Sequence, residues 1–176
     1  VVGAGVVGSA LSYELSRYDV SVCVCERSND VANGVTKANS AILHAGFDCP
    51  PGSLEARMNV PGVLMAREIC RKLDVQFRDV PTFVIAFDER ECGEIQMLYE
   101  RGVANGVPGI RIISGEEARK IEPALNPKII RALYAPSSGI INPWEYATAM
   151  AETAAVNGVT FNLDCRVSGI DPHDGI

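Results

Sequence analysis

The first eight residues of the chain read Val1-Val2-Gly3-Ala4-Gly5-Val6-Val7-Gly8. Two apolar residues typical of a buried strand run directly into the spacing G-x-G-x-x-G, and residues 6–18 then carry apolar side chains at helical spacing. We expect Val7, Leu11 and Leu15 to form the buried face of that helix. The stretch therefore predicts a strand, a tight turn and a helix.

Each glycine of this turn has a separate purpose. Gly3 permits the tight turn, Gly5 lets the backbone approach a pyrophosphate, and Gly8 lets the helix pack closely on the strand. The pyrophosphate would lie at the N-terminus of the helix, where free N–H groups and the helix dipole favour negative charge. The turn therefore predicts a dinucleotide-binding site.

A second strand is predicted at residues 20–26, which read V-S-V-C-V-C-E and end in Glu26. Both faces of this strand, including the one that carries Cys23 and Cys25, are apolar or small, as in a parallel strand covered on both sides. Glu26 follows the glycine turn by roughly the 20 residues expected for an acid that binds a ribose hydroxyl. A carboxylate there repels a 2′-phosphate, so the ligand is FAD or NAD rather than NADP. The alternative is a glycine-rich turn followed by a solvent-facing glutamate.

The segment from Gly34 to Asp48 reads G-V-T-K-A-N-S-A-I-L-H-A-G-F-D. A nicotinamide-binding domain usually continues with a plain helix at this point. This segment instead offers small residues, hydroxyls, an amide and a histidine, which let a flat ring approach the backbone and receive hydrogen bonds. The segment favours FAD over NAD.

Further along, helices are predicted at 53–73, 90–105 and 142–157, with Ser53 and Asn142 as N-caps. Proline at position 61 removes a backbone donor, so a kink or break is expected near Val60. A capping box that starts at Ser114 predicts another short helix. Strands are predicted at 82–87, 111–114, 131–135 and 159–163.

The predicted order is a β-α-β unit, a region with its own strands and short helices, and a returning α-β unit. This order is typical of a dinucleotide-binding domain that is interrupted by an inserted domain. We therefore predict an α/β fold of the FAD/NAD(P)-binding, Rossmann-like type that is discontinuous in sequence. Its first part would span residues 1–80, part of an inserted α+β substrate domain residues 81–140, and its continuation residues 141–176.

Composition excludes several function classes. The net charge of −6 disfavours a nucleic-acid partner, because phosphate backbones demand concentrated positive charge. The six cysteines form no CxxC pair and only two histidines exist, so no metal site is predicted. Reduced, buried cysteines in a cytoplasmic protein are expected, with peripheral attachment at a membrane as the alternative location. Because only two strand residues precede the glycines, and residues 167–176 look like a strand without its hairpin partner, we expect a truncated fragment of a longer protein.

The run Thr36-Lys37-Ala38-Asn39-Ser40, followed by His44-Ala45-Gly46 and Pro51-Gly52-Ser53-Leu54, resembles the FAD-dependent D-amino-acid-oxidase-like superfamily. Within it, the chain is most similar to FAD-dependent glycerol-3-phosphate dehydrogenases and L-2-hydroxyglutarate dehydrogenases. The resemblance covers essentially the whole chain. Further matching segments are Phe83–Phe87, Glu122-Pro123 and Gly139–Pro143.

This resemblance implies a flavoprotein that oxidises a small anionic secondary alcohol to a ketone. Hydride would pass to the flavin, and electrons would pass on to an external acceptor. Glycerol 3-phosphate is the first expectation for the substrate and an L-2-hydroxy acid the second, with an amine-oxidising relative as a weaker alternative. The rival from another class is a catalytically inert nucleotide-binding fragment.

The resemblance also implies roles for individual residues. Gly3, Gly5 and Gly8 would hold the pyrophosphate, and Glu26 the adenosine ribose. His44 would lie near the flavin ring, as a general base, as an electrostatic partner of the reduced flavin, or only as a hydrogen-bonding group of the cofactor loop. The other residues that would lie along the cofactor are Arg27, Thr36, Asn39 and Ser40, and Val167, whose backbone would meet the adenine.

Overall fold

The computed structural model describes residues 1–171, which divide into two compact units. The first unit comprises Val1–Ala41, Lys72–Gln76 and the chain from Asn142 onward. The second comprises Ile42–Arg71 and Phe77–Ile141. The chain therefore leaves the first unit and returns to it, in keeping with the predicted discontinuous α/β class. The domain limits at residues 80 and 140 stay a prediction.

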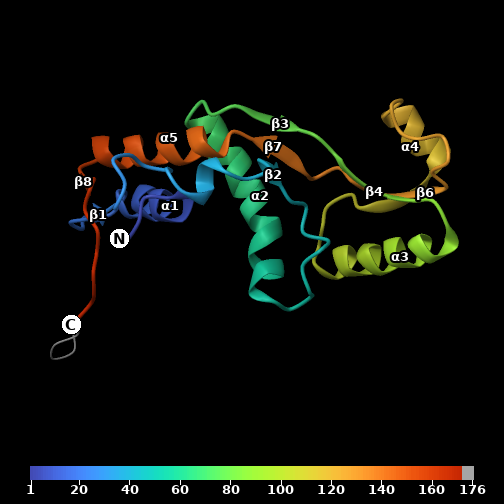
Figure 1. Ribbon diagram of the computed structural model, residues 1–176, viewed down its shortest axis with the longest axis horizontal. Coiled ribbons are helices and arrows are strands. Elements are labelled where there is room, and N and C mark those ends of the chain that lie inside the picture. The colour runs from blue at the N-terminus through green and yellow to red at the C-terminus, as the bar shows by residue number, and fades with distance from the viewer. Residues whose placement is uncertain (172–176) are drawn as a thin grey trace. The chain divides into compact units, whose positions relative to one another are not determined.

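The first unit is built on parallel strands. Strand β1 (Cys23–Cys25) pairs in parallel with β8 (Thr160–Asn162), and Val2 forms a parallel bridge with Cys25 on the other side. Helices α1 (Val6–Leu15) and α5 (Pro143–Val156) pack against each other (Figure 1). One cluster of buried hydrophobic residues in this unit consists of Ala4, Val24, Ala154 and Val159.

The buried face of α1 differs from the predicted one. Val7 is 78% exposed and Leu11 is 47% exposed, whereas Gly8, Ser9 and Ser12 are buried. Close helix packing explains the difference, since α1 packs against α5, whose buried residues are mostly alanines, and small side chains let the two backbones approach. The buried serine hydroxyls donate to backbone carbonyls of the same segment, so their burial leaves no hydrogen-bonding group unsatisfied.

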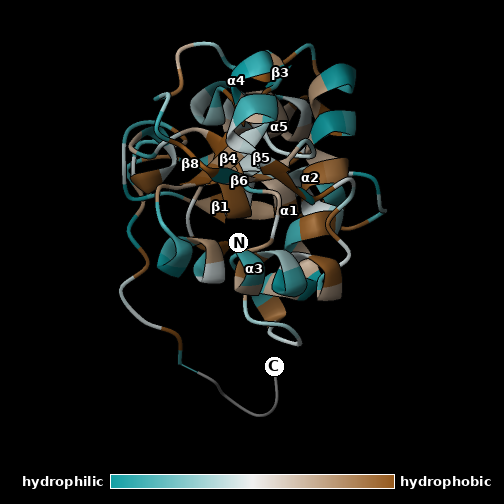
Figure 2. Ribbon diagram, turned by 90° about the vertical axis from the view of Figure 1, so that its right-hand side faces the viewer, coloured by the Kyte–Doolittle hydropathy of each residue, from teal (hydrophilic) through white to brown (hydrophobic). Residues whose placement is uncertain are grey.

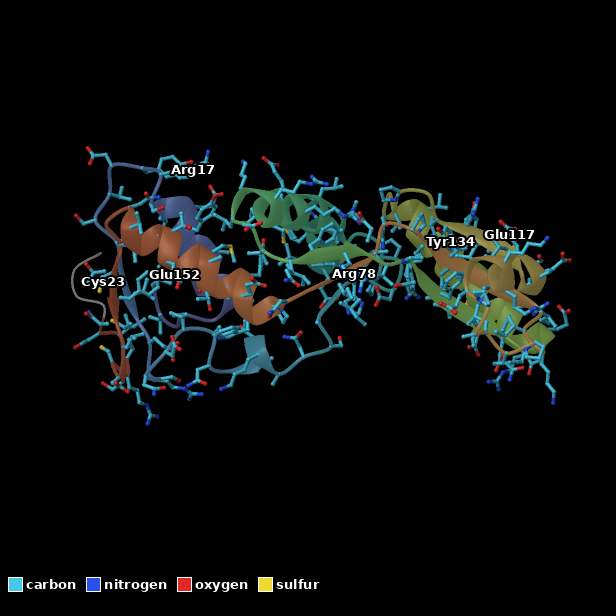
Figure 3. All side chains as sticks on the ribbon, turned by 90° about the horizontal axis from the view of Figure 1, so that it is seen from above. Arg17, Cys23, Arg78, Glu117, Tyr134 and Glu152 are labelled. Atoms are coloured by element: carbon cyan, nitrogen blue, oxygen red, sulfur yellow. The ribbon has the colours of Figure 1, made fainter. Side chains whose placement is uncertain are left out.

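Strand β1 is shorter than the predicted strand at 20–26 and is covered on one face only within residues 1–171. Val24 is fully buried, but Cys23 is exposed at the edge of its unit (Figure 3). The prediction that Cys23 packs in a core is therefore wrong for the described part of the chain. All six cysteines are free thiols, and those that are buried are Cys70 and Cys92.

A three-stranded antiparallel sheet forms the centre of the second unit, in the order β4 (Thr82–Ala86), β6 (Arg131–Ala135), β5 (Arg111–Ser114). Helix α3 (Glu89–Ala104) covers one face and α4 (Gly115–Ile121) the other (Figure 1), and the strands between them are largely hydrophobic (Figure 2). Successive side chains of β6 pack on opposite faces of the sheet, as the two-residue period of a strand requires. On the edge strand β5, the Arg111 guanidinium lies 4.9 Å from the centre of the Tyr134 ring and 3.5 Å from the Glu117 carboxylate.

A second antiparallel sheet of the same unit was not predicted. It joins β2 (Ile42–Leu43), β7 (Gly139–Ile141) and β3 (Phe77–Asp79), with β7 in the middle. Strands of two or three residues carry no measurable period in the sequence, so only the pairing partner identifies them.

Helix α2 (Leu54–Lys72) continues through Pro61, so a break near Val60 is wrong, whereas a kink there stays a prediction. A proline costs the helix one donated hydrogen bond. Buried side chains anchor α2 on both sides of the proline, at Ala56 before it and at Val63 after it, and this burial offsets the loss.

The helix caps predicted from the sequence are confirmed. The Ser53 hydroxyl accepts the Ala56 N–H at 3.1 Å, and the Asn142 side chain accepts the Glu145 N–H at 3.2 Å. The Ser114 hydroxyl caps α4 in the same way. Among residues 1–171, no helix combines the length and the apolar character that a membrane span requires.

Candidate functional site

The glycine turn at the start of the chain is held by hydrogen bonds to β1. Gly3 donates its N–H to the Cys25 carbonyl at 2.8 Å, and Cys25 donates to the Val1 carbonyl at 3.0 Å. Gly3 has a φ of +88°, a left-handed conformation that favours glycine. A Cβ atom at Gly8 would overlap the carbonyl oxygen of Gly3, so only glycine lets α1 lie this close to the turn.

The N-terminus of α1 is well suited to an anion. The helix begins after Gly5, which has no side chain to cap it, and its first turn carries no acidic residue. The Val6 N–H donates to the hydroxyl of the buried Thr36 at 2.9 Å. A Cβ atom at Gly5 would come within 3.3 Å of that same hydroxyl. Glycine at position 5 therefore lets the Thr36 hydroxyl approach the helix start closely.

Glu26 joins the end of β1 to the glycine turn. Its carboxylate accepts the Ala4 N–H at 2.7 Å through one oxygen and the Ser28 N–H at 2.8 Å through the other. Partial burial raises the pKa of this carboxyl, but the two backbone hydrogen bonds and the nearby Arg27 together lower the pKa below its usual value. Glu26 is therefore ionised, and each of its oxygens keeps a lone pair for a further donor such as a ribose hydroxyl.

A hollow of about 600 Å³ in the first unit brings most of the predicted cofactor-binding residues together. The three glycines of the turn lie along its wall with Glu26, Arg27 and Thr36. The remaining lining residues are Val1, Val2, Val6, Val7, Leu11, Ser28, Asn33, Gly34 and Val35.

Three other predicted residues do not line this hollow. The Asn39 side chain donates to the Thr36 carbonyl at 2.7 Å and accepts the Ala41 N–H at 2.8 Å, so it stabilises the turn after the 3₁₀ helix η1 (Val35–Lys37). Ser40 is exposed, and Val167 is 37% exposed. Their contacts with a cofactor stay predictions.

His44 belongs to the second unit and has a carboxylate partner. Its Nδ1 atom lies 3.8 Å from an oxygen of Asp48, and about half of its side chain is exposed. His44 also lines a hollow of about 490 Å³ in that unit. The other lining residues are Ile42, Leu43, Cys49, Glu55, Met58, Asn59, Gly62 and Val63.

Two polar neighbours complete the surroundings of His44. Burial, Asp48 and Glu55 raise the pKa of the Cys49 thiol, although Arg101 lowers it, so Cys49 is not an activated nucleophile. Sequence reasoning missed Asn59, whose buried Oδ1 atom has no hydrogen-bond partner among the described residues. A single polar residue within a helical pattern gives no signal that would have identified it.

Two arginines of the second unit bind groups of that unit itself. Arg67 lies 2.8 Å from Asp79 and donates to the Ser137 carbonyl at 2.7 Å. Arg119 donates to backbone carbonyls of the loop that follows α4. These guanidinium groups stabilise the second unit. No cluster of three or more metal-ligating side chains occurs between residues 1 and 171.

Replacing Glu26 with glutamine is expected to destabilise the complete protein at neutral pH by about 1 kcal/mol, because one of the two N–H groups loses its acceptor. The folded pKa of Glu26 lies below its unfolded value. The stabilisation is therefore present above the ordinary glutamate pKa of about 4.3, and it is lost as the pH falls through the folded pKa.

Urea unfolding of wild type and Glu26→Gln, measured from neutral to acidic pH, gives the difference in their free energies of unfolding. The difference between the two proteins should shrink as the solution is acidified. Glu14→Gln is the control, since Glu14 forms only an exposed pair with Arg17. A difference that stays constant down to acidic pH would contradict the assigned hydrogen bonds.

Comparison with known proteins places these features in context. The family model described as DAO, FAD dependent oxidoreductase, matches residues 1–176. The chain is 45% identical over 174 residues to a glycerol 3-phosphate dehydrogenase of Caloramator mitchellensis, with 99% of this chain and 36% of that protein covered. It is 31% identical to the mitochondrial L-2-hydroxyglutarate dehydrogenase of Homo sapiens, over 97% of this chain and 37% of that protein.

A solved structure agrees with these sequence matches. Dithionite-reduced L-α-glycerophosphate oxidase from Mycoplasma pneumoniae with FAD bound superposes with a TM-score of 0.85 at 31% identity. The match covers 95% of this chain and 44% of that chain. The chain thus spans less than half the length of the proteins that it matches.

Proposed function

Because the chain belongs to the DAO family of FAD-dependent oxidoreductases, we propose that it binds FAD as part of an enzyme that oxidises glycerol 3-phosphate to dihydroxyacetone phosphate. The observation that supports glycerol 3-phosphate as the substrate is the 45% identity, along 99% of the chain, to a glycerol 3-phosphate dehydrogenase. The glycine turn supports the cofactor, because it leads into the N-terminus of α1, whose first turn carries no acidic residue and whose dipole would favour a diphosphate.

The residues of the first hollow fit FAD. The turn at Gly3, Gly5 and Gly8 lines this hollow at the start of α1, and a side chain at Gly8 would overlap the turn itself. Glu26 is ionised and positioned at the end of β1, so it would receive the adenosine ribose hydroxyls. We propose that Arg27, Thr36, Asn39, Ser40 and the backbone of Val167 complete the cofactor site.

When bound, the flavin would supply a hydride acceptor for the substrate and a route for electrons to an external acceptor. The substrate hydroxyl must lose its proton as the carbon loses hydride, because the product is a ketone. We assign that proton to His44. Since the Asp48 carboxylate faces Nδ1 of His44, Nε2 is the nitrogen left for the substrate proton.

A second candidate is oxidation of an L-2-hydroxy acid such as L-2-hydroxyglutarate. The 31% identity to the human L-2-hydroxyglutarate dehydrogenase favours it, over nearly the same length of chain. Both reactions remove hydride and a proton from a secondary alcohol, so FAD and His44 would have the same roles in either. The substrates differ in the anionic group next to the alcohol, a phosphate or a carboxylate.

Steady-state assays of the complete protein with an artificial electron acceptor test the proposal. We expect kcat/KM for glycerol 3-phosphate to exceed that for L-2-hydroxyglutarate by about a hundredfold or more, since polar groups arranged for one anion discriminate strongly. The reverse preference would establish the second candidate. A protein that binds neither flavin nor substrate would show that the chain is an inert nucleotide-binding fragment.

A further inference from the structure

The loop that follows His44 is held by one end of α3. The side-chain amide of Asn105 donates to the Gly46 carbonyl at 2.9 Å and to the Cys49 carbonyl at 2.8 Å. The Arg101 guanidinium donates to the Asp48 carbonyl at 3.0 Å. Two side chains from the last turn of α3 thus fix three carbonyls within four consecutive residues.

Packing brings the helix and this loop into close contact. A Cβ atom at Gly102 would lie 3.0 Å from Cβ of Phe47 and would overlap the side chain of Ile110. Glycine at position 102 therefore lets α3 lie against the loop. Phe47 packs into the core between α3 and its sheet, and Ala45 is 3% exposed. The loop is thus anchored by apolar contacts on its inner side and by hydrogen bonds along its backbone.

The hydrogen bonds from Asn105 are difficult to replace. Gly46 has a φ of +100°, so the chain turns sharply there and no regular element provides donors for its carbonyl. Both carbonyls are partly buried, and a side chain without N–H groups at position 105 would leave them without these two donors. The loop would then be free to shift, together with Asp48, whose carboxylate lies opposite His44.

We infer that the last turn of α3, through Asn105 and Arg101, positions His44 and Asp48 for proton transfer. This inference rests on the proposed function of His44. Asn105 and Arg101 are positioning residues, because their contacts are with the loop backbone. Removal of the Asn105 donors should slow the chemical step about tenfold or more, because small misplacements of a reacting group cost large factors in rate.

Two variants of Asn105 in the complete, FAD-loaded protein test this inference. Asn105→Asp has nearly the same shape, removes both donors and places a carboxylate against two carbonyls, whereas Asn105→Ala removes the side chain. The control is Gln96→Ala on the same helix, because Gln96 is exposed and bonds only to Glu100, at 2.9 Å. Arg101→Ala is a milder variant that keeps the test valid if both changes at Asn105 prevent folding.

Three measurements separate positioning from general damage. The rate of flavin reduction at saturating glycerol 3-phosphate should fall in the Asn105 variants, while KM and FAD affinity change less than twofold. Amide hydrogen exchange of residues 45–49 should become faster in these variants and stay unchanged in Gln96→Ala. In a His44→Ala background, Asn105→Asp should have almost no further effect on the reduction rate, because it acts through His44.

The outcomes distinguish this inference from the proposed function. If His44→Ala leaves flavin reduction unchanged, the proposed function of His44 fails, whatever Asn105 does. If His44→Ala slows reduction but Asn105→Asp and Arg101→Ala match the Gln96→Ala control, the positioning role is wrong. Full additivity of His44→Ala and Asn105→Asp would also overturn it, because a purely structural effect does not depend on the imidazole.

Discussion

Gly8→Ala should weaken the binding of FAD to the complete protein about a hundredfold. The new Cβ atom would overlap the carbonyl oxygen of Gly3, and that oxygen belongs to a turn fixed by the hydrogen bond from Gly3 to Cys25. Either α1 or the turn must shift, and such overpacking costs about 1–3 kcal/mol, occasionally more. Because this strain falls on the backbone that would bind the diphosphate, the dissociation constant for FAD should rise about a hundredfold.

Fluorescence titration of the apoprotein with FAD measures this change. The control is Gly93→Ala, the same substitution at an exposed position of α3 with open space around it. It should leave FAD affinity unchanged and stabilise the protein by about 0.5–1 kcal/mol, as expected for alanine in place of glycine within a helix. Wild-type affinity in Gly8→Ala would show that FAD binds elsewhere.

His44→Ala should lower the rate of flavin reduction by about 10²–10⁴-fold, the range in which a positioned acid or base contributes. Affinity for FAD should change little, since the glycine turn and Glu26 in the first unit are expected to supply most of the cofactor contacts. His44→Asn should be equally slow, because an amide donates hydrogen bonds but does not accept the hydroxyl proton.

Rapid mixing of the FAD-loaded variants with saturating glycerol 3-phosphate measures the reduction rate, and titration of the apoproteins measures affinity. The opposite pattern, with FAD binding lost and the rate retained, would assign His44 to the support of the cofactor loop. Recovery of the rate in His44→Asn would likewise exclude proton transfer by the imidazole.

The structural features that the sequence predicts correctly depend on residues close together in the chain. The glycine turn needs particular residues at fixed intervals, and Glu26 follows at the end of the next strand, so the sequence alone predicts both. Helix caps at Ser53, Ser114 and Asn142 are equally predictable from the sequence, because a cap bonds to an N–H only a few residues away.

Other features depend on tertiary packing, which local sequence spacing does not reveal. Apolar periodicity in α1 indicated Val7 and Leu11 as buried, but the close approach of an alanine-rich helix selected the small residues instead. The hydrogen bonds from Asn105 reach residues that precede it in the chain by 56 and 59 positions. A single sequence contains no pattern that links an asparagine at the end of one helix to the loop after His44.

The most direct measurement is the visible absorbance of the purified, complete protein before and after anaerobic addition of glycerol 3-phosphate. We expect a yellow protein whose oxidised-flavin band disappears on mixing. The His44→Ala variant should be equally yellow but lose the band far more slowly. A protein that stays colourless after incubation with FAD, or a flavin band that persists with saturating glycerol 3-phosphate, would contradict this expectation.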